Sequence, residues 1–162
     1  MKYKFVRKPR VYQYRALQKA LELNTLAIWF DPGLGKTKVA IDFAAIKIAK
    51  NEVSKILIVC PLSAIGVWED EFPYDCPQEL LPTLTPIVGD MGSRINLISQ
   101  TVTKKGPQVM IINYDSLRNE TIFNSLIKWG PELLIVDEMH YTKNHLAERS
   151  KKVFQIRLRA KY

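Results

Sequence analysis

Short apolar runs alternate along the chain with segments whose apolar residues recur at helical spacing. Runs of strand length occur at 26–30, 55–61, 87–88 and 109–114 and within 132–140. Helical spacing occurs at 14–23, 36–50, 63–72 and 93–100, and a proline-rich connector occupies 73–86. Apolar strands separated by helices are typical of a parallel sheet buried on both faces. The pattern therefore predicts an α/β fold, a mostly parallel sheet with helices on both faces, with ligands at the carboxyl edge of the strands.

Length and composition fit one domain. The 162 residues suffice for a single domain with a sizeable core, 1–162, of which 1–9 form a basic N-terminal arm. No apolar stretch approaches the roughly 18 residues of a membrane span, and the N-terminus does not resemble a secretory signal. Cys60 and Cys76 lack metal-ligand spacing, which is typical of a reduced chain. We therefore expect a cytoplasmic protein with no membrane partner.

The chain carries a net charge of +8, from 24 Lys and Arg against 16 Asp and Glu. This sign suits a polyanion such as nucleic acid, and it suits a simple solvated surface equally well. The residues that would attract phosphate are Lys104, Lys105, Arg149, Lys151, Lys152, Arg157, Arg159 and Lys161.

A glycine-containing loop, "DPGLGKT", separates the first apolar run from the helical pattern that follows it. Glycines let successive backbone N–H groups point into one concavity, which holds phosphate at the positive end of the next helix. Lys36 can then reach the terminal phosphates, and the Thr37 hydroxyl can coordinate Mg²⁺. The predicted ATP-binding residues of this loop are Gly33, Leu34, Gly35, Lys36, Thr37 and Lys38. The usual motif has a further glycine where Phe30 stands, so an ordinary strand-to-helix turn is the alternative.

An acidic pair ends the last apolar run, in "LLIVDEMH". Asp137 can hold Mg²⁺, and Glu138 can orient and deprotonate the water that attacks the terminal phosphate. Two acids at a strand end are by themselves more often a helix cap or a solvated pair, and His140 by itself a surface histidine. Together with the glycine loop at the same predicted edge, the pair indicates a catalytic site in which Lys36, Asp137 and Glu138 act on Mg-ATP.

Four segments in this order resemble motifs I, Ia, Ib and II of superfamily-two helicases, and most of all the SWI/SNF-type DNA translocases. They read "DPGLGKT", "LIVCPLSAIGVWEDEF", "VMIINYDSL" and "LLIVDEMHYTKN". Phe30, Asp31 and Pro32 replace the first three residues that motif I usually has, while its phosphate-binding half is intact. Asp137 to His140 match the usual Asp-Glu-x-His, and Lys143 and Asn144 also fit the family. The resemblance covers Arg10 to Tyr162 and implies a RecA-like P-loop NTPase lobe.

The resemblance also implies roles for particular residues. In "RVYQ", Gln13 would read the adenine, and His140 would couple the nucleotide to a second RecA-like lobe that carries an arginine finger. In the family that lobe follows a segment like "QIRLRAKY", which reads as the start of another strand, so it is expected beyond Tyr162; a natural half-protein is the alternative. The residues implied to contact DNA, without sequence specificity, are Pro61, Leu62, Ser63, Asn113, Tyr114 and Ser116. Ser63 is also expected to cap a helix, and Trp68 is expected to lie in the core rather than stack on a base.

The sequence thus indicates the ATP-binding lobe of a DNA translocase or helicase, using ATP and Mg²⁺ on DNA that is double-stranded. As an isolated lobe it is expected to hydrolyse ATP poorly. A non-motor DNA- or partner-binding module with a vestigial nucleotide site is one alternative, and a lobe of a restriction-type helicase subunit is another. "YTKN" argues against the second. The compact motif spacing suggests a bacterial or phage protein, with a nuclear source as the other possibility.

Overall fold

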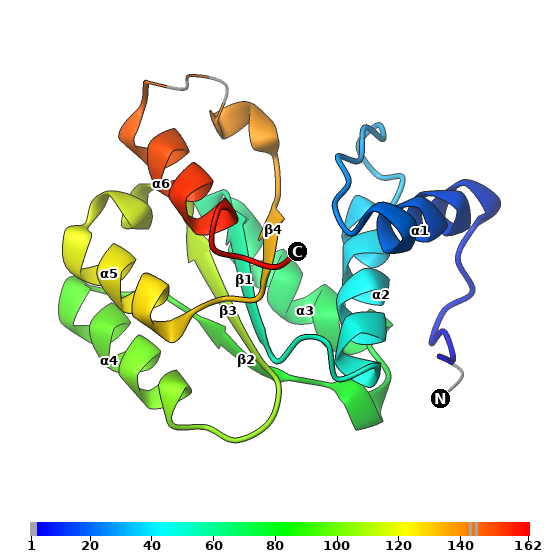
Figure 1. Cartoon of the computed structure of the whole chain (residues 1–162), viewed down its shortest axis with the longest axis horizontal. Coiled ribbons are helices and arrows are strands. Elements are labelled where there is room, and N and C mark those ends of the chain that lie inside the picture. Colours follow the sequence, from blue (N-terminus) through cyan, green and yellow to red (C-terminus); the bar gives the residue numbers. More distant parts are fainter. Residues whose placement is uncertain (1–2, 143, 145) are drawn as a thin grey trace.

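A computed structural model describes residues 3–142, 144 and 146–162, and Lys143 of the family-like segment lies outside this part. Its described strands are all parallel and lie in the order β2-β3-β1-β4 (Figure 1). The strands are β1 (Lys55–Cys60), β2 (Thr83–Pro86), β3 (Gln108–Asn113) and β4 (Leu133–Val136). The helices are α1 (Val11–Leu23), α2 (Lys36–Ala49), α3 (Ile65–Asp75), α4 (Met91–Val102), α5 (Glu120–Trp129) and α6 (Glu148–Arg157). The predicted α/β fold with a parallel sheet is confirmed.

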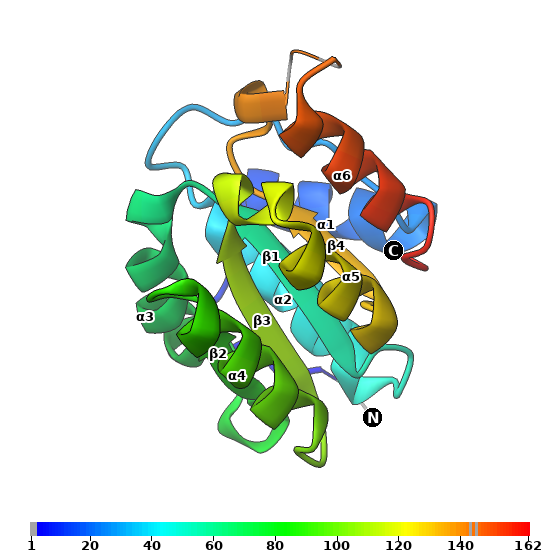
Figure 2. The ribbon, with the colours of Figure 1, turned by 90° about the vertical axis from the view of Figure 1, so that its left-hand side faces the viewer.

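The sheet separates two apolar layers because successive residues of a strand point to opposite faces. Ile56 and Ile58 of β1 pack with α1, α2 and α3. Leu57 and Val59 pack instead with α4, α5 and α6. Figure 2 shows these last three helices in front of the sheet, and Figure 1 shows α2 and α3 on its other side. Both faces are covered, and this explains the nearly continuous apolar sequence of β1 and β3.

Short 3₁₀ segments rather than long loops follow the carboxyl ends of β1, β3 and β4. They include η1 (Leu62–Ala64) after β1, η3 (Tyr114–Arg118) after β3 and η4 (Met139–Thr142) after β4, and η2 (Gln78–Leu80) precedes β2. The strand register pairs Val59 with Ile112 on one side and with Val136 on the other. The segments that follow β1, β3 and β4 therefore start at one level of the sheet.

The strand predicted at 26–30 is wrong, since the structure has irregular backbone there. A strand needs a neighbour that accepts and donates backbone hydrogen bonds, and none is recorded for this segment among the described residues. The open edge of β4 is partly occupied by the chain's last residue, because Leu134 N–H donates to the Tyr162 carbonyl at 3.0 Å. Trp29 is 83% exposed, while Ile28 and Phe30 still pack on the core.

Two smaller expectations are corrected. Ser63 lies inside η1, and α3 begins after Ala64 without a side-chain cap. The strand expected at 87–88 lies earlier, as β2, although Ile87 N–H still donates to the Ile111 carbonyl at 2.8 Å. Pro86 is tolerated because β2 is an edge strand. No helix of the described residues is both long and apolar enough to cross a bilayer.

Candidate nucleotide-binding site

The glycine loop turns sharply into α2. Gly33 and Gly35 have φ values of 80° and 75°, which lie in the left-handed region that favours glycine. The Leu34 N–H donates to the Asp31 carbonyl at 3.3 Å, and Gly35 is the N-cap of α2. The first N–H groups of α2 have no partner within the helix, so this end is suited to an anion.

The two lysines at the start of α2 have different surroundings. The Lys36 ammonium donates to the Phe30 carbonyl at 3.0 Å and lines the cavity described below. The Lys38 ammonium is buried and lies 2.9 Å from Asp42 Oδ2 and 3.5 Å from Asp75 Oδ1. The Lys38 side chain is thus committed to two carboxylates, and the prediction that it binds ATP can hold only for its backbone N–H.

Gln13 connects the start of α1 to the glycine loop. Its Oε1 accepts from Arg10 N at 2.9 Å, and its Nε2 donates to the Leu34 carbonyl at 3.0 Å. Tyr12 Oη donates to the same carbonyl at 3.2 Å. The Gln13 amide therefore holds the loop in this structure, and reading an adenine would require it to exchange these partners.

The acidic pair lies just beyond β4. Asp137 N–H donates to the Val59 carbonyl at 2.9 Å, which ties the end of β4 to β1. Its Oδ2 accepts a hydrogen bond from Trp68 Nε1 at 3.0 Å. Glu138 is exposed and adopts φ 53°, and its Oε2 lies 3.1 Å from His140 Nδ1. The base predicted from sequence is thus accessible to solvent and paired with the predicted coupling histidine.

One cavity of about 1220 Å³ brings the two motifs together. Residues separated by about a hundred positions line it, namely Lys36, Thr37, Asp137, Glu138 and His140. The Thr37 hydroxyl and the Asp137 carboxylate are oxygen donors of the type that Mg²⁺ prefers, with phosphate and water supplying its other ligands. Within the described ranges no cluster of three or more His, Cys, Asp or Glu could hold a metal unaided. The donor set therefore fits Mg²⁺ that arrives with a nucleotide.

Tyr114 and Cys60 surround the buried side of Asp137. The Tyr114 hydroxyl donates to the Asp137 backbone carbonyl. Burial, with Asp137 nearby, raises the pKa of the Tyr114 hydroxyl well above its usual value and the pKa of the Cys60 thiol to about 12. Both groups are therefore protonated at neutral pH, and Tyr114 is a hydrogen-bond donor.

The residues expected to contact DNA fall into two sets. Leu62 and Ser63 are exposed and Pro61 is partly exposed, so this segment is open to a strand of nucleic acid. The others are buried: Asn113 is 8%, Tyr114 2% and Ser116 4% exposed. Ser116 Oγ donates to Asn113 Oδ1. Side-chain contact with DNA from these three is not available in this structure, because strand β3 ends below the surface.

Several of the basic residues expected to attract phosphate are also paired. Lys152 is 7% exposed and lies 2.5 Å from Glu120 Oε1. Lys151 lies 3.5 Å from Glu148 Oε1, and Arg149 lies 3.9 Å from Asp115 Oδ1. The α6 surface is thus less positive than its sequence suggests.

Trp68 is the residue whose contact with the site the sequence did not reveal. Its helical spacing with Ile65 and Phe72 predicted a core position, and its exposure of 2% confirms that. A buried indole N–H needs an acceptor, but the sequence does not show which one. The acceptor is Asp137, from a strand 69 positions away.

The fold is that of a RecA-like α/β domain with its candidate site at the carboxyl edge of the sheet. A structure described as the Sulfolobus solfataricus SWI2/SNF2 ATPase core in complex with dsDNA superimposes with a TM-score of 0.71 at 23% identity. The match covers 94% of this chain and 30% of that chain. A nuclease-deletion mutant of the Type ISP restriction-modification enzyme LlaGI, in complex with a DNA substrate mimic, has a TM-score of 0.57 at 21% identity, covering 86% and 16%.

The chain belongs to the SNF2-related domain family, which matches residues 12–162. Among curated relatives, the human TATA-binding protein-associated factor 172 is 33% identical over 138 residues, which is 78% of this chain and 7% of that protein. The chain spans between 7% and 14% of the length of the first curated relatives that it matches. The resemblance inferred from four short motifs is thus confirmed at the level of the family.

Proposed function

We propose that this chain is the ATP-binding lobe of an ATP-dependent DNA translocase or helicase. The observation that carries the proposal is the single cavity lined by Lys36, Thr37, Asp137 and Glu138. These residue types serve phosphate, magnesium and an attacking water in phosphoryl transfer. Membership of the SNF2-related family supports the same reading.

Each residue has a distinct part in the proposed chemistry. Lys36 exchanges the neutral Phe30 carbonyl for the terminal phosphates, a stronger partner for an ammonium. Thr37 and Asp137 would hold Mg²⁺, which supplies neutralisation of phosphate charge when bound. Glu138 accepts the proton of the attacking water, and His140 orients its carboxylate through the contact at 3.1 Å.

DNA is the proposed polymer partner. The exposed segment at Leu62 and Ser63, next to the start of α3, can offer backbone N–H groups and a hydroxyl to strand phosphates. The net charge of +8 favours a polyanion, and the dsDNA in the Sulfolobus structure supports a duplex. Because phosphate contacts carry no base code, binding should not depend on sequence.

Rapid hydrolysis is proposed to need a second RecA-like lobe. An arginine finger contributes about a thousandfold or more in related phosphoryl-transfer enzymes. The chain spans 30% of the Sulfolobus ATPase core, so other parts of a motor have no counterpart in these 162 residues. The lobe by itself should bind ATP weakly and hydrolyse it slowly.

The test is ATP hydrolysis by the chain with and without duplex DNA, beside a Glu138→Gln variant that marks turnover at this site. Slow, Glu138-dependent turnover that duplex does not accelerate would support the proposal of a lobe with weak intrinsic activity. Brisk, DNA-stimulated turnover by the chain alone would contradict it.

A non-motor binding module with a vestigial nucleotide site is the second candidate. It is favoured by Gln13, whose amide is engaged by the Arg10 and Leu34 backbone rather than left open for a base. A module of this kind would bind DNA equally well with and without ATP and after Lys36→Ala. A lobe of a restriction-type helicase subunit shares the fold, as the LlaGI likeness illustrates, and the same nucleotide chemistry would apply to it.

A further inference from the structure

Two segments donate hydrogen bonds to Asp137: α3, which follows β1, and η3, which follows β3. Trp68 Nε1 in α3 donates to Asp137 Oδ2 at 3.0 Å. The Tyr114 hydroxyl in η3 donates to the Asp137 backbone carbonyl. One donor thus holds the carboxylate and the other holds the main chain of the same residue.

Trp68 is joined by a short rigid path to an exposed surface. The Ala64 N–H donates to the Pro61 carbonyl at 2.9 Å, and η1 continues directly into α3. Trp68 lies five positions after Ser63, a rise of roughly 8 Å along a helix. Trp68 is 2% exposed and packs in the core, so one continuous stretch of chain carries both the exposed η1 surface and the indole that binds Asp137.

Tyr114 has a similar position on the neighbouring strand. It is 2% exposed, and its ring stacks on Tyr141 of η4 with centroids 5.5 Å apart and planes 8° apart. The segment η3 that carries it also exposes Arg118. Tyr114 thus reaches from η3 the same residue that Trp68 reaches from α3.

We propose that Trp68 and Tyr114 are positioning residues that orient Asp137 for Mg²⁺. The indole takes one carboxylate oxygen, so the second oxygen serves the metal in a fixed orientation. The inference rests on the proposed function, since it needs Mg-ATP in the cavity.

If these hydrogen bonds only stabilised the fold, removing one of them would affect ATP binding no more than removing any other buried hydrogen bond. The chain offers a matched control in Trp129 of α5, which is 3% exposed and donates to Gln108 Oε1, also at 3.0 Å. Gln108 begins β3, and so lies at the opposite end of the sheet from Asp137. Trp68→Phe and Trp129→Phe therefore remove the same donor from equally buried rings at different distances from the site.

The first measurement is the affinity for ATP with Mg²⁺ and with EDTA, for the full 162-residue chain and for Trp68→Phe, Tyr114→Phe and Trp129→Phe. Partners of metal ligands contribute about tenfold or more to metal affinity. Trp68→Phe should reduce the gain in affinity on adding Mg²⁺ by about tenfold and leave the affinity in EDTA unchanged. Tyr114→Phe should reduce the gain in the same direction, and Trp129→Phe should leave it as in the wild type.

The second measurement uses the wild-type chain, so it does not depend on whether a variant folds. In the wild type labelled with ¹⁵N, the indole N–H signals of the three tryptophans report their own hydrogen bonds. Adding Mg²⁺ to the ATP-loaded chain should shift the Trp68 signal and leave the Trp129 signal in place. An unmoved Trp68 signal would overturn the inference even if Trp68→Phe fails to fold.

The outcomes separate the two proposals. If the wild type gains no ATP affinity from Mg²⁺, the proposed function fails and this inference fails with it. If the wild type gains affinity and Trp68→Phe behaves like Trp129→Phe, only the positioning role is overturned. A selective loss in Trp68→Phe and Tyr114→Phe supports the positioning role.

Discussion

Glu138 adopts a backbone conformation that residues with side chains rarely take, with φ 53°. Such a conformation costs on the order of 1 kcal/mol or more and persists where the surroundings impose it. Here the preceding residue is tied to β1 through Val59, and the Glu138 carbonyl accepts from Tyr141 N at 3.0 Å. This conformation turns the chain away from the direction of β4, and the side chain of Glu138, the proposed base, is exposed there.

Gly35 and Gly33 form a matched pair for testing the glycine loop. Both have left-handed φ values, so Gly→Ala costs about 1–2 kcal/mol of conformational energy at either position. A Cβ at Gly35 would lie 2.4 Å from Gln13 Nε2, whereas a Cβ at Gly33 meets nothing within 4 Å. Gly35→Ala should therefore lower the free energy of unfolding in urea by more than Gly33→Ala. Equal losses would show that the Gln13 contact does not hold the loop.

At the residue scale, the sequence identifies the groups at the ends of strands better than the partners of buried groups. Asp137 and Glu138 follow strand β4, and parallel topology places such residues at the carboxyl edge of the sheet, whereas the run before Lys36 is not a strand. The partners of Lys38 come from two helices, at Asp42 and Asp75, and no spacing along the chain indicates the second of these.

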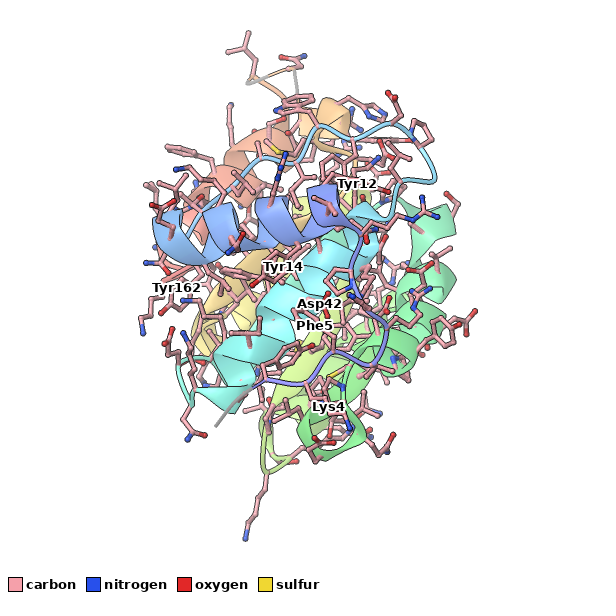
Figure 3. The ribbon with its side chains drawn as sticks, turned by 90° about the vertical axis from the view of Figure 1, so that its right-hand side faces the viewer. Lys4, Phe5, Tyr12, Tyr14, Asp42 and Tyr162 are labelled. Carbon is pink, nitrogen blue, oxygen red and sulfur yellow. The ribbon has the colours of Figure 1, made fainter. Side chains whose placement is uncertain are left out.

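Among the elements, the N-terminal segment differs most from its prediction as a basic arm. Figure 3 shows it crossing α2, with Phe5 near Asp42. Tyr3 Oη donates to Asp42 Oδ1 at 3.0 Å, and Arg7 Nε donates to Asp75 Oδ1 at 2.7 Å. The arm therefore hydrogen-bonds the buried carboxylate of α2 and neutralises that of α3 through Arg7, whose charge is not available to a polyanion.

Arg7→Ala should destabilise the fold, because Asp75 is fully buried and would keep only Lys38 as a cationic partner. The expected loss in the free energy of unfolding is about 1–2 kcal/mol, at the lower end for charged hydrogen bonds because the Arg7 side chain is 43% exposed. Urea denaturation measures it, with Lys4→Ala as the control from the same segment. A loss no larger than that of the exposed Lys4 would contradict the account.

A charged contact at Glu52 also holds Tyr162 at the open edge of β4. Glu52 Oε2 accepts from Lys47 Nζ at 2.8 Å and from Tyr162 Oη at 2.8 Å. These bonds lower the pKa of the Glu52 carboxyl from 4.5 to about 2, with the Lys47 bond the larger cause. Glu52 thus connects Lys47 of α2 to Tyr162, whose backbone carbonyl accepts a hydrogen bond from Leu134 of β4.

The pH dependence follows from the direction of that shift. A carboxyl whose pKa is lower in the folded chain stabilises the fold fully above about pH 4.5, and the contribution is lost as pH falls towards 2. Glu52→Gln should make stability fall less steeply between these pH values. Thermal unfolding across the range measures this, with the exposed Glu22→Gln as the charge control. An unchanged acid slope for Glu52→Gln would refute the prediction.

The predicted strands show what a pattern of apolar residues can and cannot establish. Runs at 55–61 and 109–114 became β1 and β3 because each has a neighbour on both sides. The run at 26–30 is equally apolar, but a strand also requires a neighbouring strand for its backbone hydrogen bonds. The residues of the run do not reveal whether such a neighbour exists. Helix α6 was missed because its sequence is mostly polar and it buries only a few positions, among them Val153 and Ile156.

At the scale of the whole molecule, the two-sided sheet is what makes the site. The layer around α2 includes Phe30, just before the glycine loop, and the opposite layer includes Tyr114 and Leu117 of η3. Trp68 and Tyr114 come from different layers and meet at Asp137. We expect a lobe built this way to bind a nucleotide, and the chain spans only 7% of the human relative described above.

The central claim is that this cavity binds Mg-ATP through Lys36, and calorimetric titration of ATP in Mg²⁺ tests it most directly. Lys36→Ala is compared with Lys50→Ala at the other, exposed end of α2. The account predicts one saturable site that Lys36→Ala weakens by about tenfold or more, since hydrogen bonds to charged groups contribute about 1.5–3 kcal/mol, and that Lys50→Ala leaves unchanged. No saturable binding, or equal affinity in Lys36→Ala and the wild type, would contradict it.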